Sequence, residues 1–449
     1  MIASNLLRKL THLQRVLLQI KKYGTAVDKP QFLGINSIFT NDIQFVNKDN
    51  YGSIPIYRIF ESSGNVKLPD DKKLDNAYLL NMYRDMVTIS IMDKIMYESH
   101  RQGRISFYMT NTGEEAVQIG SAAALTPEDT VYAQYRETGV LLHRGYPLIK
   151  FMNQCYGNCE DDGKGRQMPV HYGSKEFNFV TISSPLTTQL PQAVGAAYAL
   201  KLDKKDACVA CYFGEGAASE GDAHAAFNFA ATLSCPVIFF CRNNGYAIST
   251  SAVEQFKGDG IAAKGPAYGI DTIRVDGNDV LAMYYATKSA RDFCIKQQKP
   301  VLIEAMTYRL GHHSTSDDST VYRSTEEIAQ WSTYAPLARF RDYLESLGVW
   351  CQEREQELLN STRKEILRVL AEAEKKLKPH WKELFTDVYK EIPDHVRYLN
   401  LKILKLQNWH RFQSFRYNFT HCRKQVNLME KHLEEFREHY PLDSFIHKK

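Results

Sequence analysis

Short apolar runs alternate with stretches of helical periodicity through the middle of the chain. The runs are rich in β-branched and aromatic residues, which is typical of buried strands. The clearest runs occupy residues 207–213, 236–242, 271–277 and 300–309, and the helical stretches between them occupy 219–234 and 278–298. Either Asn278 or Asp279 is placed to cap the second helix. Apolar strands that alternate with helices predict an α/β fold with a doubly wound, mainly parallel sheet, whose ligands bind at the carboxyl ends of the strands.

The pattern is different on both sides of this alternation. Residues 27–65 contain short apolar pieces separated by Gly, Asn and Pro, and predict irregular structure. Residues 74–102 predict one long amphipathic helix, with Met82 and Met86 on its apolar face. The expected organisation is an N-terminal extension with the long helix (26–110), a cofactor-binding α/β core (111–330), a helical C-terminal region (331–397), an atypical insertion (398–423) and a C-terminal helix and tail (424–449).

Residues 1–25 have the composition of a mitochondrial transit peptide. They hold five basic residues, leucines at helical spacing and no acidic residue, and the first acid of the chain is Asp28. A secretory signal would instead have a compact apolar centre. The alternative interpretation is a basic surface helix. A transit peptide would place the mature protein in the mitochondrial matrix.

Composition and charge exclude several classes of protein. No apolar run approaches the length of roughly 18 residues that a membrane-spanning helix needs, so no membrane span is expected. The formal net charge of +4 comes from residues 1–25, which leaves the remainder close to neutral and gives no basis for a nucleic-acid partner. Cys208 and Cys211 form a CxxC, but they lie on an expected strand and point to opposite faces, which argues against a metal or redox pair.

The sequence Gly214-Glu215-Gly216 marks the carboxyl end of the first expected strand. The glycines allow positive φ and let a ligand approach the backbone. Ser219 and Glu220 open the next helix, whose N-terminus suits a phosphate. An acid beside a phosphate would repel it unless a cation lay between them. Mg²⁺ fits this position, because it takes one or two carboxylates together with phosphate oxygens.

Two residues at the end of the following strand extend this arrangement. Asn244 offers a neutral oxygen to the same ion, and Arg242 can pair with the phosphate. The alternative is a tight strand–helix turn with a solvent-facing Glu215 and an ordinary Asn-Gly turn. The acid, the helix start, the second strand and the paired asparagines together favour a cofactor site.

This constellation resembles the thiamine diphosphate motif, in which Gly-Asp-Gly is followed by paired asparagines. Glu215 replaces the usual aspartate, which keeps the charge and lengthens the reach. Further segments resemble the alpha subunits of mitochondrial branched-chain 2-oxoacid dehydrogenases: "GRISFYMTNTGEEA", "QYRETGVLLHRGYP", "GKGRQMPVHYG", "TISSPLTTQLPQAVGAAYA", "NNGYAIST" and "RLGHHSTSDDS". The resemblance runs from about Lys29 to Val396 and resumes near the carboxyl end.

The resemblance implies the ligands of the cofactor residue by residue. Glu215, Asn244 and the carbonyl of Tyr246 would hold Mg²⁺. The diphosphate side of thiamine diphosphate would contact Tyr135, Arg136, Gly216, Ala217, Arg242 and His313. Ser184 and Leu186 would line the aminopyrimidine side. A K⁺-binding loop would consist of Ser183, Pro185, Thr188 and Gln189.

The implied reaction is the oxidative decarboxylation of branched-chain 2-oxo acids, with transfer of the acyl group to a lipoyl arm. This is the chemistry of 3-methyl-2-oxobutanoate dehydrogenase (2-methylpropanoyl-transferring). His313 is the candidate catalytic residue, because an imidazole at a strand end can donate a proton or stabilise charge. A purely structural histidine is the alternative. Arg309 is a weaker candidate for binding the phosphate or the neighbouring loop.

The resemblance also implies partners. The glutamate that activates the cofactor would come from a beta subunit, in an assembly of two alpha and two beta chains. A lipoyl-bearing acyltransferase core would accept the product. Ser314 and Ser324 match kinase sites, which implies a regulatory kinase and phosphatase. The alternatives are a pyruvate dehydrogenase alpha subunit and a non-catalytic regulatory or assembly subunit.

Residues 398–423 match neither neighbouring segment of the family pattern. The stretch is basic and aromatic and contains no acidic residue. Joining residue 397 to residue 424 gives "DHVRKQVNLMEK", which restores the family register. The segment is therefore interpreted as a retained intron or a gene-model artefact. The alternative is a genuine insertion, such as an extra helix of this chain that packs on the partner chain.

Overall fold

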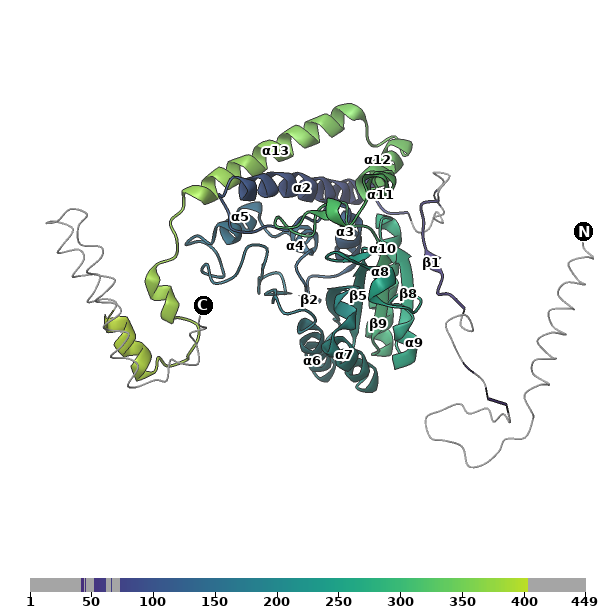
Figure 1. Ribbon diagram of the computed structural model, residues 1–449, viewed down its shortest axis with the longest axis horizontal. Coiled ribbons are helices and arrows are strands. Elements are labelled where there is room, and N and C mark those ends of the chain that lie inside the picture. The colour runs from purple at the N-terminus through teal and green to yellow at the C-terminus, as the bar shows by residue number, and fades with distance from the viewer. Residues whose placement is uncertain (1–41, 44, 46–51, 62–65, 67–72, 403–449) are drawn as a thin grey trace, which may run out of the picture.

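The computed structural model describes residues 42–43, 45, 52–61, 66 and 73–402 (Figure 1). The predicted transit peptide and the predicted C-terminal helix and tail, residues 1–25 and 424–449, lie outside the described residues. Of the atypical insertion, only residues 398–402 are described, and they continue a helical stretch that begins at residue 394.

A seven-stranded sheet forms the centre of the protein, and every pairing between neighbouring strands is parallel. In spatial order its strands are β1 Ile56–Tyr57, β8 Asp271–Asp276, β9 Val301–Met306, β5 Val237–Asn243, β4 Val209–Gly214, β2 Thr130–Tyr132 and β3 Phe179–Val180. The four strands predicted from apolar runs are therefore confirmed, and so is the doubly wound α/β class.

Three strands of the sheet were not predicted. β1, β2 and β3 have only two or three residues each, which is too short for a periodicity to show. The expectation that residues 27–65 are irregular is wrong at one place, because Ile56 and Tyr57 pair with Arg274 and Val275 of β8 at the edge of the sheet.

Helices cover both faces of the sheet and divide the interior into two cores. Along β4 and the residue before it, side chains alternate between the two cores. Cys208, Ala210 and Tyr212 face one core, and Val209, Cys211 and Phe213 face the other. α6 Gln189–Leu202 and α7 Gly221–Thr232 cover the second core, whereas α2 Asn76–Arg101, α3 Glu115–Ala124, α4 Thr138–His143, α5 Leu148–Tyr156 and α10 Val280–Gln297 surround the first. The prediction that the two CxxC thiols point to opposite faces is confirmed.

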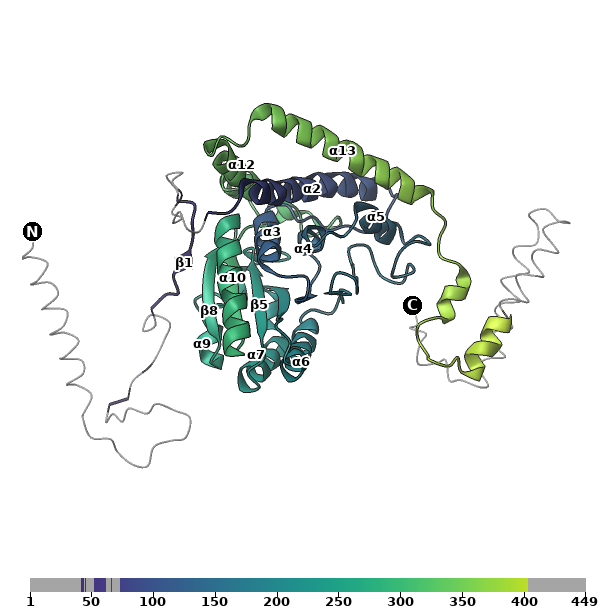
Figure 2. The same cartoon turned by 180° about the vertical axis from the view of Figure 1, so that it is seen from behind.

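The long helix α2 is buried on more than the one face that an amphipathic pattern predicts. α12 Pro336–Ser346 and α13 Gln352–Lys375 also pack on α2, and Figures 1 and 2 both show α13 running along α2. Polar side chains of α2 such as Asp93 and Ser99 are buried as well, and Asp93 accepts from the Tyr108 hydroxyl at 3.0 Å and from Asn111 Nδ2 at 2.9 Å. Within the described residues, no helix is both long and apolar enough to cross a membrane.

The remaining elements are short and connect the strands to the helices. They are η3 Ala217–Ser219, β6 Tyr246–Ala247, β7 Thr250–Ser251, α8 Ala252–Gln255, α9 Lys264–Tyr268, η4 Ser319–Val321, α11 Thr325–Ser332 and η5 Trp381–Phe385. β6 and β7 form a small antiparallel pair directly after β5. Most of these elements follow the carboxyl ends of the central strands.

Asp279 caps α10, which resolves the alternative between Asn278 and Asp279. Its Oδ1 accepts a hydrogen bond from the Ala282 amide at 2.9 Å. Its Oδ2 accepts from the amides of Ile59 and Phe60 at 2.7 and 2.6 Å, and the side chain is fully buried. One carboxylate thus holds both the helix start and the segment that follows β1.

Asp279→Ala should lower the free energy of unfolding by about 2–4 kcal/mol, because it leaves buried amide donors without an acceptor. Urea unfolding followed by circular dichroism measures the change. Asp75→Ala is the matched control: Asp75 caps α2 through one exposed bond to Ala77 at 2.9 Å. Its loss should cost about 1 kcal/mol or less. Equal effects of the two substitutions would contradict the role given to Asp279.

Candidate active site

A cavity of about 360 Å³ opens at the carboxyl ends of β4 and β5. Most of the predicted cofactor ligands line it: Tyr135, Arg136, Leu186, Glu215, Gly216, Ala217, Arg242, Asn244, Tyr246 and His313. Arg309, the weaker candidate, lines it too. These residues come from separate parts of the chain and meet because parallel strands end at the same edge of the sheet.

Glu215 follows β4 directly, and its side chain is buried. The alternative of an ordinary turn with a solvent-facing Glu215 is therefore wrong. Its Oε2 accepts a hydrogen bond from the Asn244 amide at 3.3 Å. Its Oε1 has no hydrogen-bond partner among the residues that the structure describes. Burial raises the pKa of the Glu215 carboxyl to about 7, and the charge of Glu114 acts in the same direction. A divalent cation would satisfy the free oxygen and stabilise the ionised form.

The backbone around Glu215 is closely packed. A Cβ atom at Gly216 would lie 2.4 Å from Cβ of Ala247, so only glycine fits between β4 and the short strand β6. After Gly216 the chain forms the 3₁₀ turn η3, and α7 begins at Gly221. The helix start predicted at Ser219 and Glu220 is therefore correct to within two residues.

Asn244 lies between Glu215 and Tyr246. Its Oδ1 accepts from the Tyr246 amide at 3.2 Å, and its Nδ2 donates to Oε1 of Glu114 at 2.9 Å. Within the described part of the chain, no three His, Cys, Asp or Glu side chains gather as a metal site. A cation here would therefore be held by one carboxylate, one amide oxygen and a backbone carbonyl, with further oxygens from a ligand.

Arg242 is buried at the end of β5 between two carboxylates that the sequence did not reveal. Its Nε donates to Oε1 of Glu137 and its Nη1 to Oε2 of Glu114, both at 2.6 Å. Its Nη2 is buried and finds no acceptor in the described residues. The guanidinium is thus fixed by two carboxylates, belongs to a residue that lines the cavity, and keeps one donor that is unpaired in this part of the chain. An anion such as a phosphate suits this free donor.

Arg309 carries a buried charge that forms no direct ion pair with a carboxylate of the described residues. Its donors bond to neutral acceptors: the carbonyls of Tyr246 and Ile248 at 3.4 and 2.7 Å, and the Tyr322 hydroxyl at 2.9 Å. Its Nε is buried without a partner in the same part of the chain. Burial lowers the pKa of Arg309, and the charge of Arg136 lowers it further. The site is therefore suited to an anion.

His313 is held in a neutral form by its burial and by the arginines around it. Arg136 Nη2 and Arg309 Nη1 lie 3.2 and 3.3 Å from its Nδ1. Arginine only donates, so Nδ1 is the acceptor and Nε2 carries the proton. Burial lowers the pKa of His313 to about 3, and the charges of Arg136 and Arg309 contribute. The Tyr135 ring packs edge-on against the imidazole, with centroids 6.1 Å apart.

The segment from Ser183 to Gln189 lies beside the cavity, but only part of this segment lines the cavity. Leu186 reaches the cavity, whereas Ser184 does not: its hydroxyl is 2.6 Å from Nε2 of His171. The Thr188 hydroxyl donates to the Pro185 carbonyl at 3.0 Å, and Gln189 Nε2 donates to the Tyr212 carbonyl at 3.0 Å. Thr187 has a φ of +65°, which is rare for a β-branched residue and marks a constrained turn.

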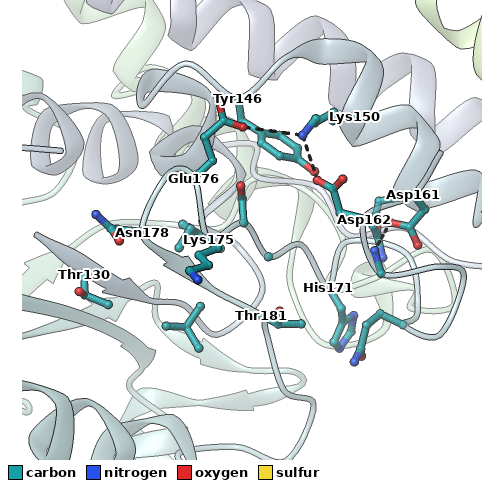
Figure 3. Close-up of a pocket in the computed structure, with 17 residues that line it drawn as sticks. Thr130, Tyr146, Lys150, Asp161, Asp162, His171, Lys175, Glu176, Asn178 and Thr181 are labelled. Atoms are coloured by element: carbon teal, nitrogen blue, oxygen red, sulfur yellow. Dashed lines mark hydrogen bonds and ion pairs between the residues drawn. The ribbon is translucent and has the colours of Figure 1, made fainter. Parts of the chain in front are cut away.

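A second, larger cavity of about 630 Å³ lies at the β3 edge of the sheet (Figure 3). It contains none of the predicted site residues. Lys150 forms ion pairs with Asp162 and Glu176 at 3.1 and 3.9 Å across one side of it. His171 lines its opposite side, so the ring that contacts Ser184 separates the second cavity from the wall of the candidate site.

Ser314 and Ser324 lie on the segment that follows His313. Asp317 Oδ2 accepts from the His313 amide at 2.7 Å and from the Tyr322 hydroxyl at 2.6 Å, which ties this segment to the backbone of His313. Ser314 is partly exposed, next to His313. Ser324 is exposed and caps α11 by accepting from the Glu327 amide at 3.1 Å.

Comparison with known proteins gives consistent matches. The family model for the dehydrogenase E1 component matches residues 83–382. The chain is 52% identical over 429 residues to the mitochondrial 2-oxoisovalerate dehydrogenase subunit alpha of Mus musculus, which covers 95% of this chain and 91% of that protein. It is 52% identical to the Homo sapiens protein of the same name with the same coverage, and 55% identical over 407 residues to that of Caenorhabditis elegans, covering 90% and 88%.

The imidazole of His313 should stay neutral down to about pH 4 in the cofactor-free protein, because its pKa of about 3 lies below the ordinary value of 6.5. A diphosphate bound beside Arg136 and Arg309 should raise this pKa toward the ordinary value. NMR titration of the histidine Cε1–H signals measures both values, with His313→Asn to identify the resonance. A midpoint between pH 6 and 7 without cofactor would contradict the neutral assignment.

Proposed function

The chain belongs to the dehydrogenase E1 component family, and we propose that it is the alpha subunit of a mitochondrial 2-oxoisovalerate dehydrogenase. It would act in the thiamine diphosphate-dependent oxidative decarboxylation of branched-chain 2-oxo acids in the mitochondrial matrix. The observation that carries this proposal is the pair of buried, unpartnered groups at one edge of the sheet, the Glu215 carboxylate oxygen and the Arg242 Nη2 donor. They suit a cation and a phosphate side by side.

The residues around the cavity fit Mg²⁺ and a diphosphate. Glu215 Oε1, Asn244 Oδ1 and the carbonyl of Tyr246 would hold Mg²⁺. Arg136, Arg242 and Arg309, with the backbone at Gly216 and Ala217, would contact the diphosphate. Leu186 would line the aminopyrimidine side, with Ser184 behind it. Thiamine diphosphate, when bound, supplies a nucleophilic carbon that attacks the keto group and an electron sink for the pair left by CO₂.

The protein's own contribution is to place charges and one proton. The arginines fix a diphosphate through donors that need no rearrangement, because Arg242 is already oriented by Glu114 and Glu137. His313 presents a neutral imidazole, and its Nε2–H, for which the described residues give no acceptor, would donate to a reacting oxygen or carboxylate. The edge-on Tyr135 ring limits rotation of this imidazole. We propose His313 as the catalytic residue on this basis.

A partner chain would complete the site. Leu186 and Ile248, which line the cavity, are 40% and 54% exposed, and Val253 nearby is 77% exposed. An apolar rim around a cofactor cavity is typical of a surface that another chain covers. We propose a beta subunit there, in an assembly of two alpha and two beta chains that passes the acyl group to a lipoyl-bearing acyltransferase core.

We also propose that the turn from Ser183 to Gln189 binds K⁺. The turn from Ser183 to Gln189 is closed by the Thr188 bond to the Pro185 carbonyl, and Gln189 is anchored to β4 through Tyr212. Hydroxyl, carbonyl and amide oxygens on such a turn are the ligands that an alkali cation takes. An ion bound there would stiffen the segment that carries Ser184 and Leu186.

The two alternative functions are less well supported. A pyruvate dehydrogenase alpha subunit would share the chemistry, but the relatives compared above carry the 2-oxoisovalerate name. A non-catalytic subunit would have no need for the unpartnered buried Glu215 and Arg242 atoms, whose burial costs folding free energy. The unpartnered buried atoms therefore favour a catalytic subunit that binds a cofactor there.

The proposal is tested with the purified heterotetramer of this chain and a beta subunit. 2-Oxoisovalerate should be decarboxylated with a much higher kcat/KM than pyruvate. Glu215→Ala should abolish Mg²⁺-dependent cofactor binding, measured by calorimetry, while circular dichroism and assembly are unchanged, because Glu215 lies on a loop at the end of β4.

Asp222→Ala is the matched control, because this exposed acid lies in the first turn of α7, shortly after Glu215 in the chain. It should bind Mg²⁺ and thiamine diphosphate like the wild type. Wild-type cofactor binding by Glu215→Ala would contradict the assignment of the site, and a preference for pyruvate would contradict the proposed substrate.

We also propose that Ser314 and Ser324 are sites for a regulatory kinase and phosphatase. A phosphate on Ser314 would add about −1.5 to −2 charges beside the cofactor diphosphate and close to Asp317. It would repel both and disrupt the Asp317 bonds to His313 and Tyr322. Ser324 is different, because a phosphate at the N-cap of α11 is favoured by the helix dipole.

Ser314→Glu should therefore reduce activity sharply and increase proteolytic cleavage of residues 312–323, whereas Ser324→Glu should have the smaller effect on both. Steady-state assay and limited proteolysis of the heterotetramer measure these changes. Full activity of Ser314→Glu with unchanged proteolysis would count against regulation through this segment.

A further inference from the structure

Glu114 is not among the predicted site residues, yet its side chain contacts three of them, Arg242, Asn244 and Arg136. It is the N-cap residue of α3, but its side chain makes no capping bond to that helix. Its carboxylate is fully buried and turns toward the ends of β4 and β5. Oε2 accepts from Arg242 Nη1 at 2.6 Å, Oε1 accepts from Asn244 Nδ2 at 2.9 Å, and Arg136 Nε lies 4.0 Å from Oε1.

The bond to Asn244 decides which way its amide faces. With Nδ2 donating to Glu114, the amide oxygen is on the other side, where it accepts from the Tyr246 amide at 3.2 Å. The reversed orientation would set two oxygens against each other at Glu114 and two donors against each other at Tyr246. Glu114 therefore keeps an oxygen, and not an NH₂ group, toward the position between Glu215 and Tyr246.

The bond to Arg242 decides which donor of the guanidinium remains free. Glu137 takes Nε and Glu114 takes Nη1, which leaves Nη2 as the donor without a partner in the described residues. If Glu114 lost its charge, Arg242 would keep one anchor and could rotate about it. Nη2 would then no longer be held in one place.

We propose that Glu114 is a positioning residue that orients the cation ligand Asn244 and the phosphate ligand Arg242 with a single carboxylate. This inference rests on the proposed function, because it assumes that the site binds Mg²⁺ and a diphosphate together. Its consequence is that the cation and the diphosphate lose affinity jointly when Glu114 changes. Residues that orient metal ligands in this way typically contribute about 10–100-fold to affinity.

Glu115 provides a matched control on the adjacent position. It is equally buried, but its carboxyl accepts from the Gly113 amide at 2.9 Å and contacts neither Arg242 nor Asn244. Burial raises its pKa to about 8, so it is mostly protonated at neutral pH and glutamine resembles it closely. The same substitution at the two positions thus separates positioning of the ligands from disturbance of α3.

The test uses the cofactor-free heterotetramer and titration calorimetry with thiamine diphosphate in the presence of Mg²⁺. Glu114→Gln should raise the Kd by about 10–100-fold. Its kcat at saturating cofactor should stay within about threefold of the wild type, since Glu114 does not line the cavity. Glu115→Gln should bind with unchanged Kd. Without cofactor, Glu114→Gln should melt below the wild type, because Arg242 loses one buried carboxylate partner, and Glu115→Gln should melt close to it. Only Glu114→Gln should also lose the rise in melting temperature on cofactor binding.

Two outcomes would overturn the inference: an unchanged Kd in Glu114→Gln, or an equal rise in Kd in Glu115→Gln. If Glu114→Gln does not assemble, Glu114→Asp retains the charge on a shorter side chain and should assemble with a Kd raised severalfold; a wild-type Kd in that variant would overturn the inference as well. Failure of the wild type itself to bind would instead contradict the proposed function.

Discussion

The pairing of Arg242 with Glu114 and Glu137 is the interaction on which the arrangement of the site depends. All three side chains are buried, and they come from the end of β5, the start of α3 and the loop after β2. Removing Arg242 would leave two buried carboxylates without this partner, which typically costs about 3–5 kcal/mol, and removing either glutamate would leave Arg242 with one carboxylate instead of two. The Glu137 carboxylate also accepts from the amides of Gln134 and Tyr135 at 2.9 and 2.8 Å, so it fixes the loop that carries Tyr135 and Arg136.

The cluster uses its hydrogen-bonding capacity unevenly. Arg242 pairs through Nε and Nη1, but its Nη2 is buried and unpartnered among the described residues. The same is true of Nε of Arg309 and Oε1 of Glu215, and both residues line the same cavity. Such groups oppose folding unless a ligand satisfies them. The two hydrophobic cores on either side of the sheet stabilise the fold enough to offset the cost of these buried, unpartnered groups. Folding thus prepares the site for a cation and an anion, and binding should in turn stabilise the fold.

The sequence predicts an element well when the pattern of the element's own residues is enough to determine its structure, and poorly when contacts with distant residues determine it. β4, β5, β8 and β9 were predictable because each is a run of six or seven residues with a strong apolar signal. β1 to β3 are too short for such a signal. Glu215 and Asn244 were found from a local motif. Glu114 and Glu137 were missed because their role depends on tertiary pairing, although an arginine within the apolar run that forms β5 was a usable signal that buried acids must lie opposite it.

The central claim is that Glu215, Asn244 and Arg242 receive a cation and a diphosphate together. The most direct test is the anomalous scattering of Mn²⁺, used in place of Mg²⁺, in crystals of the heterotetramer grown with thiamine diphosphate. A single Mn²⁺ peak in contact with Glu215 and Asn244 side-chain oxygens, with the diphosphate against Arg242, is the predicted result. A peak elsewhere, or cofactor bound with no metal at Glu215, would contradict the account.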